Sequence, residues 1–333
     1  MIGGRALLVD PLPVGDGQTS ACGAPVRVLR ALGAAGSIQE VHDDLVIHTP
    51  GRDVRWRVPE PFCTFDYRAC CRAAFDASGA GFVQASVRGR RGATALTSAG
   101  EITARVLVDA TGWRAALAGR DGAPRGGRYF GLEAEVPAPF APGLHFYFWR
   151  DAAPDGYAWV FPAGSVSRVG ILSYRGRSHL GPQLDALLAR LGLPPGPRHG
   201  GFLGAGLARP VVDGVFVAGD AAGHCLPFTG EGIRSAVWAG YVCGELVRRQ
   251  LDGEISAAAS AAEYAGYVAR QRRRLRVLEW STVAALRLPA RLLGLLAACV
   301  SRPGPLGAFM RHYLATFAAD DGAAPAVRPI PAA

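Results

Sequence analysis

The chain has 333 residues, half of them hydrophobic, which suits one large globular domain or two of ordinary size. Its formal net charge of +9 would raise nucleic acid or an anionic membrane as partners, but every positive side chain counted is arginine, and neither lysine nor asparagine occurs. Both missing residue types have AT-rich codons, so a GC-rich genome explains the bias, and we expect no nucleic-acid partner.

The first 124 residues predict an α/β unit that ends in a small meander. In chain order the predicted elements are a strand ending at Asp10, a helix over 25–36, one or two strands over 38–58, a helix from the N-cap Thr64 to a stop at Gly79, and short strands at 81–88, 93–98 and 101–109. The last strand ends in the sequence DATG, Asp109 to Gly112, in which small residues follow a carboxylate.

From residue 125 the pattern changes to aromatic segments that alternate like an antiparallel sheet with one covered face. A short helix at 183–192 follows, the α/β pattern returns near 208, and everything from 256 is helical apart from a break at 301–305. The predicted domains are residues 1–124 with 208–255, a sheet domain at 125–207, a helical region at 256–318 and a disordered tail at 319–333.

The seven cysteines are irregularly spaced and form no C-x-x-C, so we expect neither a disulfide framework nor a zinc or other metal site. With no signal peptide recognised, the chain is predicted to be cytoplasmic. The apolar run at 292–300 is too short to span a bilayer. The arginine-flanked helices at 281–317 either lie on the inner membrane face or pack over the sheet.

The stretch VFVAGDAAGHCLPFTGEGI, residues 215–233, predicts a ligand site. Residues 215–217 suit a buried parallel strand, and Asp220 comes where that strand ends, the edge at which open α/β sheets bind ligands. TGEGI then leads into a helix whose free N–H groups favour an anion. The apolar stripe of that helix is expected at Ile233, Ala236, Val237, Gly240, Gly244, Val247 and Leu251.

Three segments, GDAAGHCLPFTGEGI, GYAWVFP at 156–162 and ACGAP at 21–25, together resemble the geranylgeranyl reductase family of FAD-dependent oxidoreductases. That family is related to lycopene cyclases and flavin monooxygenases, and the resemblance covers most of residues 3–250. It implies an α/β (α+β) fold: an FAD-binding Rossmann-like three-layer domain, an inserted antiparallel-sheet substrate domain and a helical C-terminal region. It also implies FAD, reduced by NADPH or a ferredoxin-like donor, and reduction of C=C bonds in an isoprenoid or other apolar small molecule.

The resemblance assigns residues as follows. Asp10 would bind the adenosine ribose, and Tyr157 and Trp159 would face the isoprenoid cavity. The further FAD contacts would be Cys22, Gly23, Asp220, Pro227, Gly230, Gly232 and Ile233. No side chain is an obvious general acid, and the candidates are Cys22, Tyr157 and His224. Each has a structural alternative: an inert loop thiol, sheet core and a satisfied loop histidine.

No G-x-G-x-x-G occurs in the 333 residues. In the family this loop and the first strand hold the pyrophosphate, so we expect the segment to be encoded upstream of a misplaced start codon. The alternative is a diverged chain that binds flavin weakly or not at all. Two other functions stay open: a flavin-dependent monooxygenase or halogenase relative, and a non-catalytic protein without flavin. Halogenases carry the motif W-x-W-x-I-P. The segment YAWVFP matches the spacing of that motif but not its residues.

Overall fold

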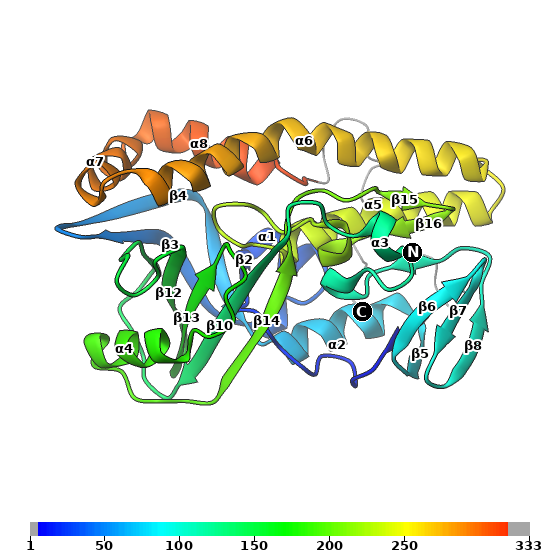
Figure 1. The fold of residues 1–333 in the computed structure, drawn as a ribbon, viewed down its shortest axis with the longest axis horizontal. Coiled ribbons are helices and arrows are strands. Elements are labelled where there is room, and N and C mark those ends of the chain that lie inside the picture. The colour runs from blue at the N-terminus through cyan, green and yellow to red at the C-terminus, as the bar shows by residue number, and fades with distance from the viewer. Residues whose placement is uncertain (1–5, 319–333) are drawn as a thin grey trace.

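The computed structural model describes residues 6–318, so the tail predicted at 319–333 lies outside the described residues. Figure 1 shows a layer of helices, α5 to α8, along the top of the molecule. An eight-stranded sheet lies beneath one end of this layer, and small sheets lie beneath the other end. The functional site described below lies between the large sheet and the helices.

The α/β part consists of small sheets. In one of them β1 (Leu7–Asp10) pairs with β5 (Gly81–Gln84) in parallel. In another, β16 (Val215–Val217) pairs with β9 (Val108–Asp109) in parallel, whereas β15 (Val211–Val212) pairs with β16 antiparallel. The meander is formed by β6 (Val87–Arg91), β7 (Thr94–Thr97) and β8 (Gly100–Thr103). The predicted strands 81–88 and 101–109 are therefore each split in two. The first splits because Ala85 N–H still bonds to Asp10 of β1, whereas Ser86 already pairs with the meander.

The large sheet has the order β14-β10-β13-β12-β11-β3-β4-β2. Its strands are β2 (Gly23–Pro25), β3 (Ile38–Thr49), β4 (Arg52–Phe65), β10 (Arg128–Val136), β11 (Leu144–Tyr147), β12 (Gly156–Ala163), β13 (Val166–Ser173) and β14 (Arg198–Gly204). The sheet therefore extends beyond residues 125–207, because the β3–β4 hairpin joins it through a parallel pairing of β3 with β11. Every other neighbouring pair is antiparallel.

The helices are α1 (Val26–Ala31), α2 (Tyr67–Ser78), α3 (Gly119–Gly122), α4 (Gly181–Leu191), α5 (Ile233–Leu251), α6 (Ala257–Arg287), α7 (Ala290–Val300) and α8 (Pro303–Ala315), with short 3-10 turns at Ala35–Ser37, Gly112–Arg114 and Gly219–Ala222. Within residues 6–318 no single helix is long and apolar enough to cross a membrane. One pair, Arg291–Val300 with Pro303–Ala315, satisfies length and composition together but is bent by 91°.

Two expectations for the helix termini and faces are wrong. Asp66, not Thr64, caps α2, because its Oδ1 accepts the Ala69 N–H at 2.8 Å, while the Thr64 hydroxyl donates to the Pro162 carbonyl inside the sheet. On α5 the buried stripe includes Trp238, Ala239, Val242 and Leu246, whereas Gly240 is exposed. The prediction counted the glycines of α5 as part of an apolar stripe. Small residues fit such a pattern whether or not a neighbouring element covers them.

The large sheet is covered on both faces at its centre, where one covered face was predicted. β12 is buried along its whole length. Tyr157, Trp159 and Phe161 point to the helical layer, and Ala158 and Val160 point to the opposite side. There α4 packs its buried face of Leu184, Leu187 and Leu188. The bulky side chains on one face and small ones on the other leave room for a cavity only on the helical side.

Candidate functional site

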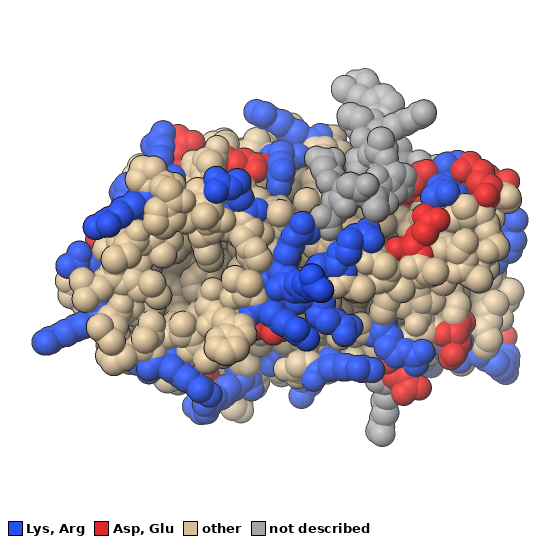
Figure 2. Space-filling view, turned by 90° about the horizontal axis from the view of Figure 1, so that it is seen from above, with Lys and Arg blue, Asp and Glu red and all other residues tan. Residues whose placement is uncertain are grey.

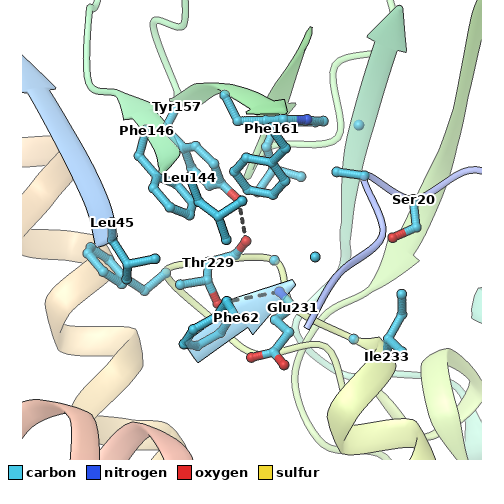
Figure 3. A pocket seen from close by; sticks show the side chains of 18 of the residues that line it. Ser20, Leu45, Phe62, Leu144, Phe146, Tyr157, Phe161, Thr229, Glu231 and Ile233 are labelled. Carbon is cyan, nitrogen blue, oxygen red and sulfur yellow. Dashed lines mark hydrogen bonds between the residues drawn. The ribbon is translucent and has the colours of Figure 1, made fainter. Parts of the chain in front are cut away.

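A cavity lies between the helix-facing side of the large sheet and the loop before α5 (Figure 3). Its empty volume is about 1110 Å³, including its open mouth, which is enough for a small organic ligand. The walls come from residues 19–23, strands of the large sheet, residues 228–233 and α8. The sequence-predicted residues that line it are Gly23, Tyr157, Trp159, Gly230, Gly232 and Ile233.

The sheet wall of the cavity is aromatic and apolar. Alternation along β12 turns Tyr157, Trp159 and Phe161 toward the cavity. Phe146 on β11 lies 5.7 Å from the Tyr157 ring and 5.2 Å from the Phe161 ring, measured between centroids. Among the described lining residues, the single charged side chain is Glu231. This wall therefore suits an apolar ligand.

Trp159 is held in one orientation by its neighbours. Its Nε1 donates to Glu133 Oε2 at 2.8 Å, and Glu133 Oε1 contacts His199 Nε2 at 3.0 Å. Gly170 lies directly opposite Trp159 on β13, and a Cβ there would lie 2.1 Å from the indole ring. The buried Glu133 thus fixes the polar edge of the indole, and the missing side chain at Gly170 provides the space for its rings.

We expect Gly170→Ala to displace Trp159 and to lower the free energy of unfolding by about 1–3 kcal/mol, the usual range for overpacking a core. Urea unfolding and the near-ultraviolet circular dichroism of tryptophan measure the two effects. Gly240→Ala is the matched control: a Cβ at this exposed helical position meets nothing within 4 Å. It should stabilise the protein by about 0.5–1 kcal/mol. Equal effects of the two substitutions would contradict the packing argument.

The loop from Leu226 to Gly232 forms the opposite wall. Phe228 (φ 76°) and Gly230 (φ 66°) both adopt the left-handed region, which folds the loop back on itself. Two tyrosines of the sheet hold it there. The Tyr157 hydroxyl donates to the Thr229 carbonyl, and the Tyr174 hydroxyl donates to the Phe228 carbonyl at 2.5 Å. The loop is therefore attached directly to the aromatic wall that it faces.

Glu231 ties the same loop to the C-terminal helices. Its carboxylate accepts bidentate bonds from Arg234 at 2.9 and 3.1 Å, and it also accepts the Tyr313 hydroxyl of α8. Burial alone would lower the pKa of Arg234, but the Glu231 carboxylate outweighs it and raises the pKa. Arg234 Nη1 also donates to the Thr316 carbonyl at 2.5 Å. This network closes the cavity on the side of α8.

The segment ACG presents backbone, not a thiol, to the cavity. Ala21 and Gly23 line it, but the Cys22 side chain is fully buried in a separate cluster with Cys63, Cys70 and others. Burial raises the pKa of the Cys22 thiol far above its usual value. Cys22 itself has φ 54°, and the buried Arg168 donates to the Ala21 carbonyl at 3.3 Å. The arrangement favours the structural alternative for Cys22.

Asp109 ends β9, and Asp220 lies in the 3-10 turn that follows the neighbouring parallel strand β16, but the two carboxylates have opposite surroundings. Asp109 is fully satisfied: its two oxygens accept bonds from Thr111 N–H, Thr111 Oγ1, Leu117 N–H and Ala118 N–H at 2.7–3.0 Å. No donor among residues 6–318 contacts the Asp220 carboxylate, and burial raises its pKa to about 6. A Cβ at Gly232 would lie 3.4 Å from Asp220 Oδ1, so this unpartnered carboxylate lies directly behind the cavity loop.

Besides Cys22 and Asp220, three further predicted residues lie away from the cavity lining. Asp10 is exposed at the end of β1, where its Oδ1 accepts the Leu12 N–H at 2.8 Å. Pro227 is buried within the loop. His224 is fully buried, neither ring nitrogen has a hydrogen-bond partner, and burial lowers its pKa to about 3. Its ring packs on Phe317 at 4.6 Å, so it is not the satisfied loop histidine that the structural alternative described.

The sequence comparisons point to one group of enzymes. No family model matches the chain. Two relatives are digeranylgeranylglycerophospholipid reductases: one of Methanocaldococcus jannaschii, 32% identical over 117 residues, and one of Methanothrix thermoacetophila, 36% identical over 111 residues. These alignments cover 32% and 31% of this chain and 30% and 28% of the relatives, so the chain matches less than a third of their length.

Solved structures agree with this over the whole fold. A geranylgeranyl bacteriochlorophyll reductase-like protein of Thermoplasma acidophilum superimposes with a TM-score of 0.79 at 18% identity, covering 94% of this chain and 90% of that one. The resemblance to geranylgeranyl reductases is confirmed. A flavin-dependent brominase shares the fold with a TM-score of 0.68 at 15% identity, covering 92% and 86% of the two chains. The chain therefore shares its fold with these two proteins, and the predicted mixed α/β fold class is confirmed.

Several residues that line the cavity were not predicted from the sequence. Phe62, Phe228, Glu231, Met310 and Tyr313 all line the cavity. Glu231 lies within the motif that was singled out, and a charged residue between two glycines was the available signal. Met310 and Tyr313 lie on α8, far along the chain; packing of the helices at 281–317 over the sheet was one of the two expectations, but the local sequence does not indicate which of their side chains reach the cavity.

Proposed function

We propose that this chain is an FAD-dependent oxidoreductase that reduces a C=C bond of an isoprenoid or other apolar substrate. One observation carries the proposal. A single cavity is bounded by the segments predicted to contact flavin, at Gly23 and 230–233, and by the aromatic strand predicted to contact substrate, at Tyr157 and Trp159. These segments are far apart in the sequence, and a flavin and an apolar chain need to meet in this way for hydride transfer.

The described residues fit the inner part of FAD. Asp220 is a half-buried carboxylate beside Gly232 without a partner within residues 6–318, and a hydroxyl-rich ribityl chain would supply the donors that it lacks. Gly23, Gly230 and Gly232 leave backbone surface free for a flat ring. Asp10 would hold the adenosine ribose. When bound, FAD supplies the hydride, and we propose that NADPH or a ferredoxin-like donor reduces it in the cytoplasm.

The chain's own residues would orient the substrate and exclude water. The aromatic wall offers no hydrogen bonds to water beyond its few hydroxyls, so an apolar chain displaces water favourably. Of the three candidates for the general acid, Tyr157 lines the cavity, whereas Cys22 and His224 do not. The Tyr157 hydroxyl stays protonated, because burial raises its pKa. Without substrate, it donates a hydrogen bond to the Thr229 carbonyl. Tyr157 is thus the candidate that the geometry favours.

Flavin binding tests the cofactor part of the proposal. The purified protein is titrated with FAD, although residues 1–333 contain no G-x-G-x-x-G. Absorbance in the flavin bands and FAD titration should then show binding, and Asp220→Ala should weaken it by about tenfold or more, the loss expected for one charged hydrogen-bonding partner. A protein that retains its fold but binds no FAD would leave the non-catalytic alternative.

Anaerobic turnover separates a reductase from a monooxygenase or halogenase. The FAD-loaded, chemically reduced protein is mixed with a polyprenyl substrate without oxygen, and the saturated product is sought by mass spectrometry. A reductase turns over under these conditions, whereas an oxygen-dependent enzyme does not. We expect saturation of at least one C=C bond, and product that appears only with oxygen would favour the second function.

A further inference from the structure

Exposed apolar side chains concentrate on the end of α6 and on α7. Of the eleven large hydrophobic side chains that are exposed in residues 6–318, six lie between residues 277 and 296. These six, called the apolar patch below, are Val277, Trp280, Val283, Leu292, Leu295 and Leu296. Trp280 is 76% exposed, more than any of the others. Such a concentration on a folded protein marks an interaction surface.

The outer face of α7 is not needed for the packing of that helix. Its inner face lies on the β3–β4 hairpin, where Trp56 Nε1 donates to the Ala297 carbonyl at 2.9 Å and a Cβ at Gly294 would meet Thr49 at 2.7 Å. Leu292, Leu295 and Leu296 follow the i, i+3, i+4 spacing and are all exposed, so they form one outward stripe. The helix is therefore apolar on both sides, and only one side has a partner within the described chain.

The charge around the apolar patch is strongly positive. Residues 270–302 contain eight arginines and a single acidic residue, Glu279. Six of these arginines are exposed and have no ion-pair partner within the described chain: Arg272, Arg273, Arg276, Arg287, Arg291 and Arg302. Figure 2, which looks onto the layer of α6 to α8, shows arginine side chains gathered beside an uncharged, hollowed surface. Exposed tryptophan and leucine flanked by unpaired arginines are complementary to an anionic lipid surface.

The apolar patch is adjacent to the cavity. Trp56 lines the cavity and also bonds to α7 through the Ala297 carbonyl. Phe309 of α8 lines the same end of the cavity, and its ring centroid lies 5.7 Å from that of Trp56. A single layer of side chains thus separates α7 from the cavity. An apolar ligand that left a lipid layer under α7 would have a short path to the aromatic wall.

We propose that the apolar patch and its six arginines dock the protein on the surface of an anionic lipid bilayer, with the hairpin end of the cavity beside the lipid. Trp280 and the α7 leucines enter the interfacial region, and the arginines contact the headgroup phosphates. The docking itself follows from the surface alone; the use of the docked state to take up an apolar substrate rests on the proposed function.

Vesicle flotation of the protein without added flavin or substrate tests the docking. We expect binding to phosphatidylcholine vesicles that contain phosphatidylglycerol, little binding to phosphatidylcholine alone, and weaker binding as salt is raised. Leu295→Ser with Leu296→Ser should weaken binding by about tenfold or more, and so should Arg287→Gln with Arg291→Gln. The emission of Trp280 should shift to the blue on binding, and Trp280→Phe should remove most of that shift while leaving the protein bound.

Matched variants keep the result specific. Val41→Ser removes a comparably exposed apolar side chain from β3, and Arg88→Gln with Arg105→Gln removes two exposed arginines without ion-pair partners in the meander region. Neither should change vesicle binding. Equal binding to both vesicle types, or no binding by a folded protein, would overturn the proposal. So would a dimer in sedimentation that Leu295→Ser with Leu296→Ser dissociates, because the apolar patch would then join two copies. None of these measurements depends on flavin. A negative result for membrane docking can therefore be distinguished from a negative result for the proposed reductase activity.

Discussion

Replacing Asp220 by asparagine is expected to stabilise the cofactor-free protein at neutral pH. The Asp220 carboxylate is half-buried and has no hydrogen-bond donor within residues 6–318, and the burial raises its pKa from 3.8 to about 6. A shift of about two units corresponds to roughly 3 kcal/mol, the free energy by which ionisation at neutral pH destabilises the fold. Asparagine removes the charge but still desolvates an amide, so a net gain of about 1–3 kcal/mol remains.

The gain should depend on pH in one direction. The folded protein binds the Asp220 proton more tightly than the unfolded chain, so the ionisation penalty is absent below about pH 4, grows between pH 4 and 6, and is complete above pH 6. The difference between wild type and Asp220→Asn should follow this curve. Urea unfolding at several pH values measures it. The same difference also removes the contribution of His224 to the pH dependence, because His224 is present in both proteins. Burial lowers the pKa of His224 to about 3, so its effect on the free energy of unfolding changes with pH in the opposite direction.

Asp109→Asn is the control, because Asp109 ends the neighbouring strand with four hydrogen bonds to its carboxylate. In asparagine an NH2 group replaces one carboxylate oxygen, and this group cannot accept the hydrogen bonds that the oxygen accepted. The free energy of unfolding should therefore fall by about 3 kcal/mol or more. The same chemical change thus has opposite signs at two carboxylates with similar sequence surroundings. If both substitutions destabilise, Asp220 has donors that the structure does not show and is not poised for a ligand.

This contrast shows where sequence reasoning was sufficient and where it was not. Both DATG and GDAAG were read as strand, carboxylate and small residues, and the strands β9 and β16 do lie side by side. Which of the two carboxylates is satisfied depends on the N–H groups of Leu117 and Ala118, and their approach is a tertiary feature. Local sequence specifies the end of a strand, but it does not specify which loop folds over that end.

The large sheet supports the same conclusion. The alternation in GYAWVFP predicted a strand of an antiparallel sheet, and the family resemblance placed Tyr157 and Trp159 at a cavity; both side chains line a cavity in the structure. The β3–β4 hairpin was predicted only as local strands, because its parallel pairing with β11 joins residues about 100 positions apart. The space for Trp159 depends on Gly170, whose role is visible only when the two strands are placed in register. The features that could not be predicted from the sequence are thus those that depend on pairing between distant strands and on the register of that pairing.

Arg234→Met should be among the most damaging single substitutions in the chain. Arg234 is fully buried, holds Glu231 through two hydrogen bonds and also binds the Thr316 carbonyl. Methionine fills similar space but leaves the buried Glu231 carboxylate with only the Tyr313 hydroxyl. Breaking a buried ion pair by removing one partner costs about 3–5 kcal/mol, because the remaining charge stays buried. Urea unfolding measures this loss.

The double substitution Arg234→Met with Glu231→Leu separates charge from packing. Replacing both members of a buried pair by apolar residues is often neutral, so the double variant should recover most of the stability that Arg234→Met loses. The Tyr313 hydroxyl would lose its acceptor, however, and α8 would lose its link to the cavity loop. We therefore expect a stable double variant in which hydrogen exchange at α8 is faster than in wild type. A double variant no more stable than Arg234→Met would show that Arg234 acts through the Thr316 carbonyl and not through Glu231.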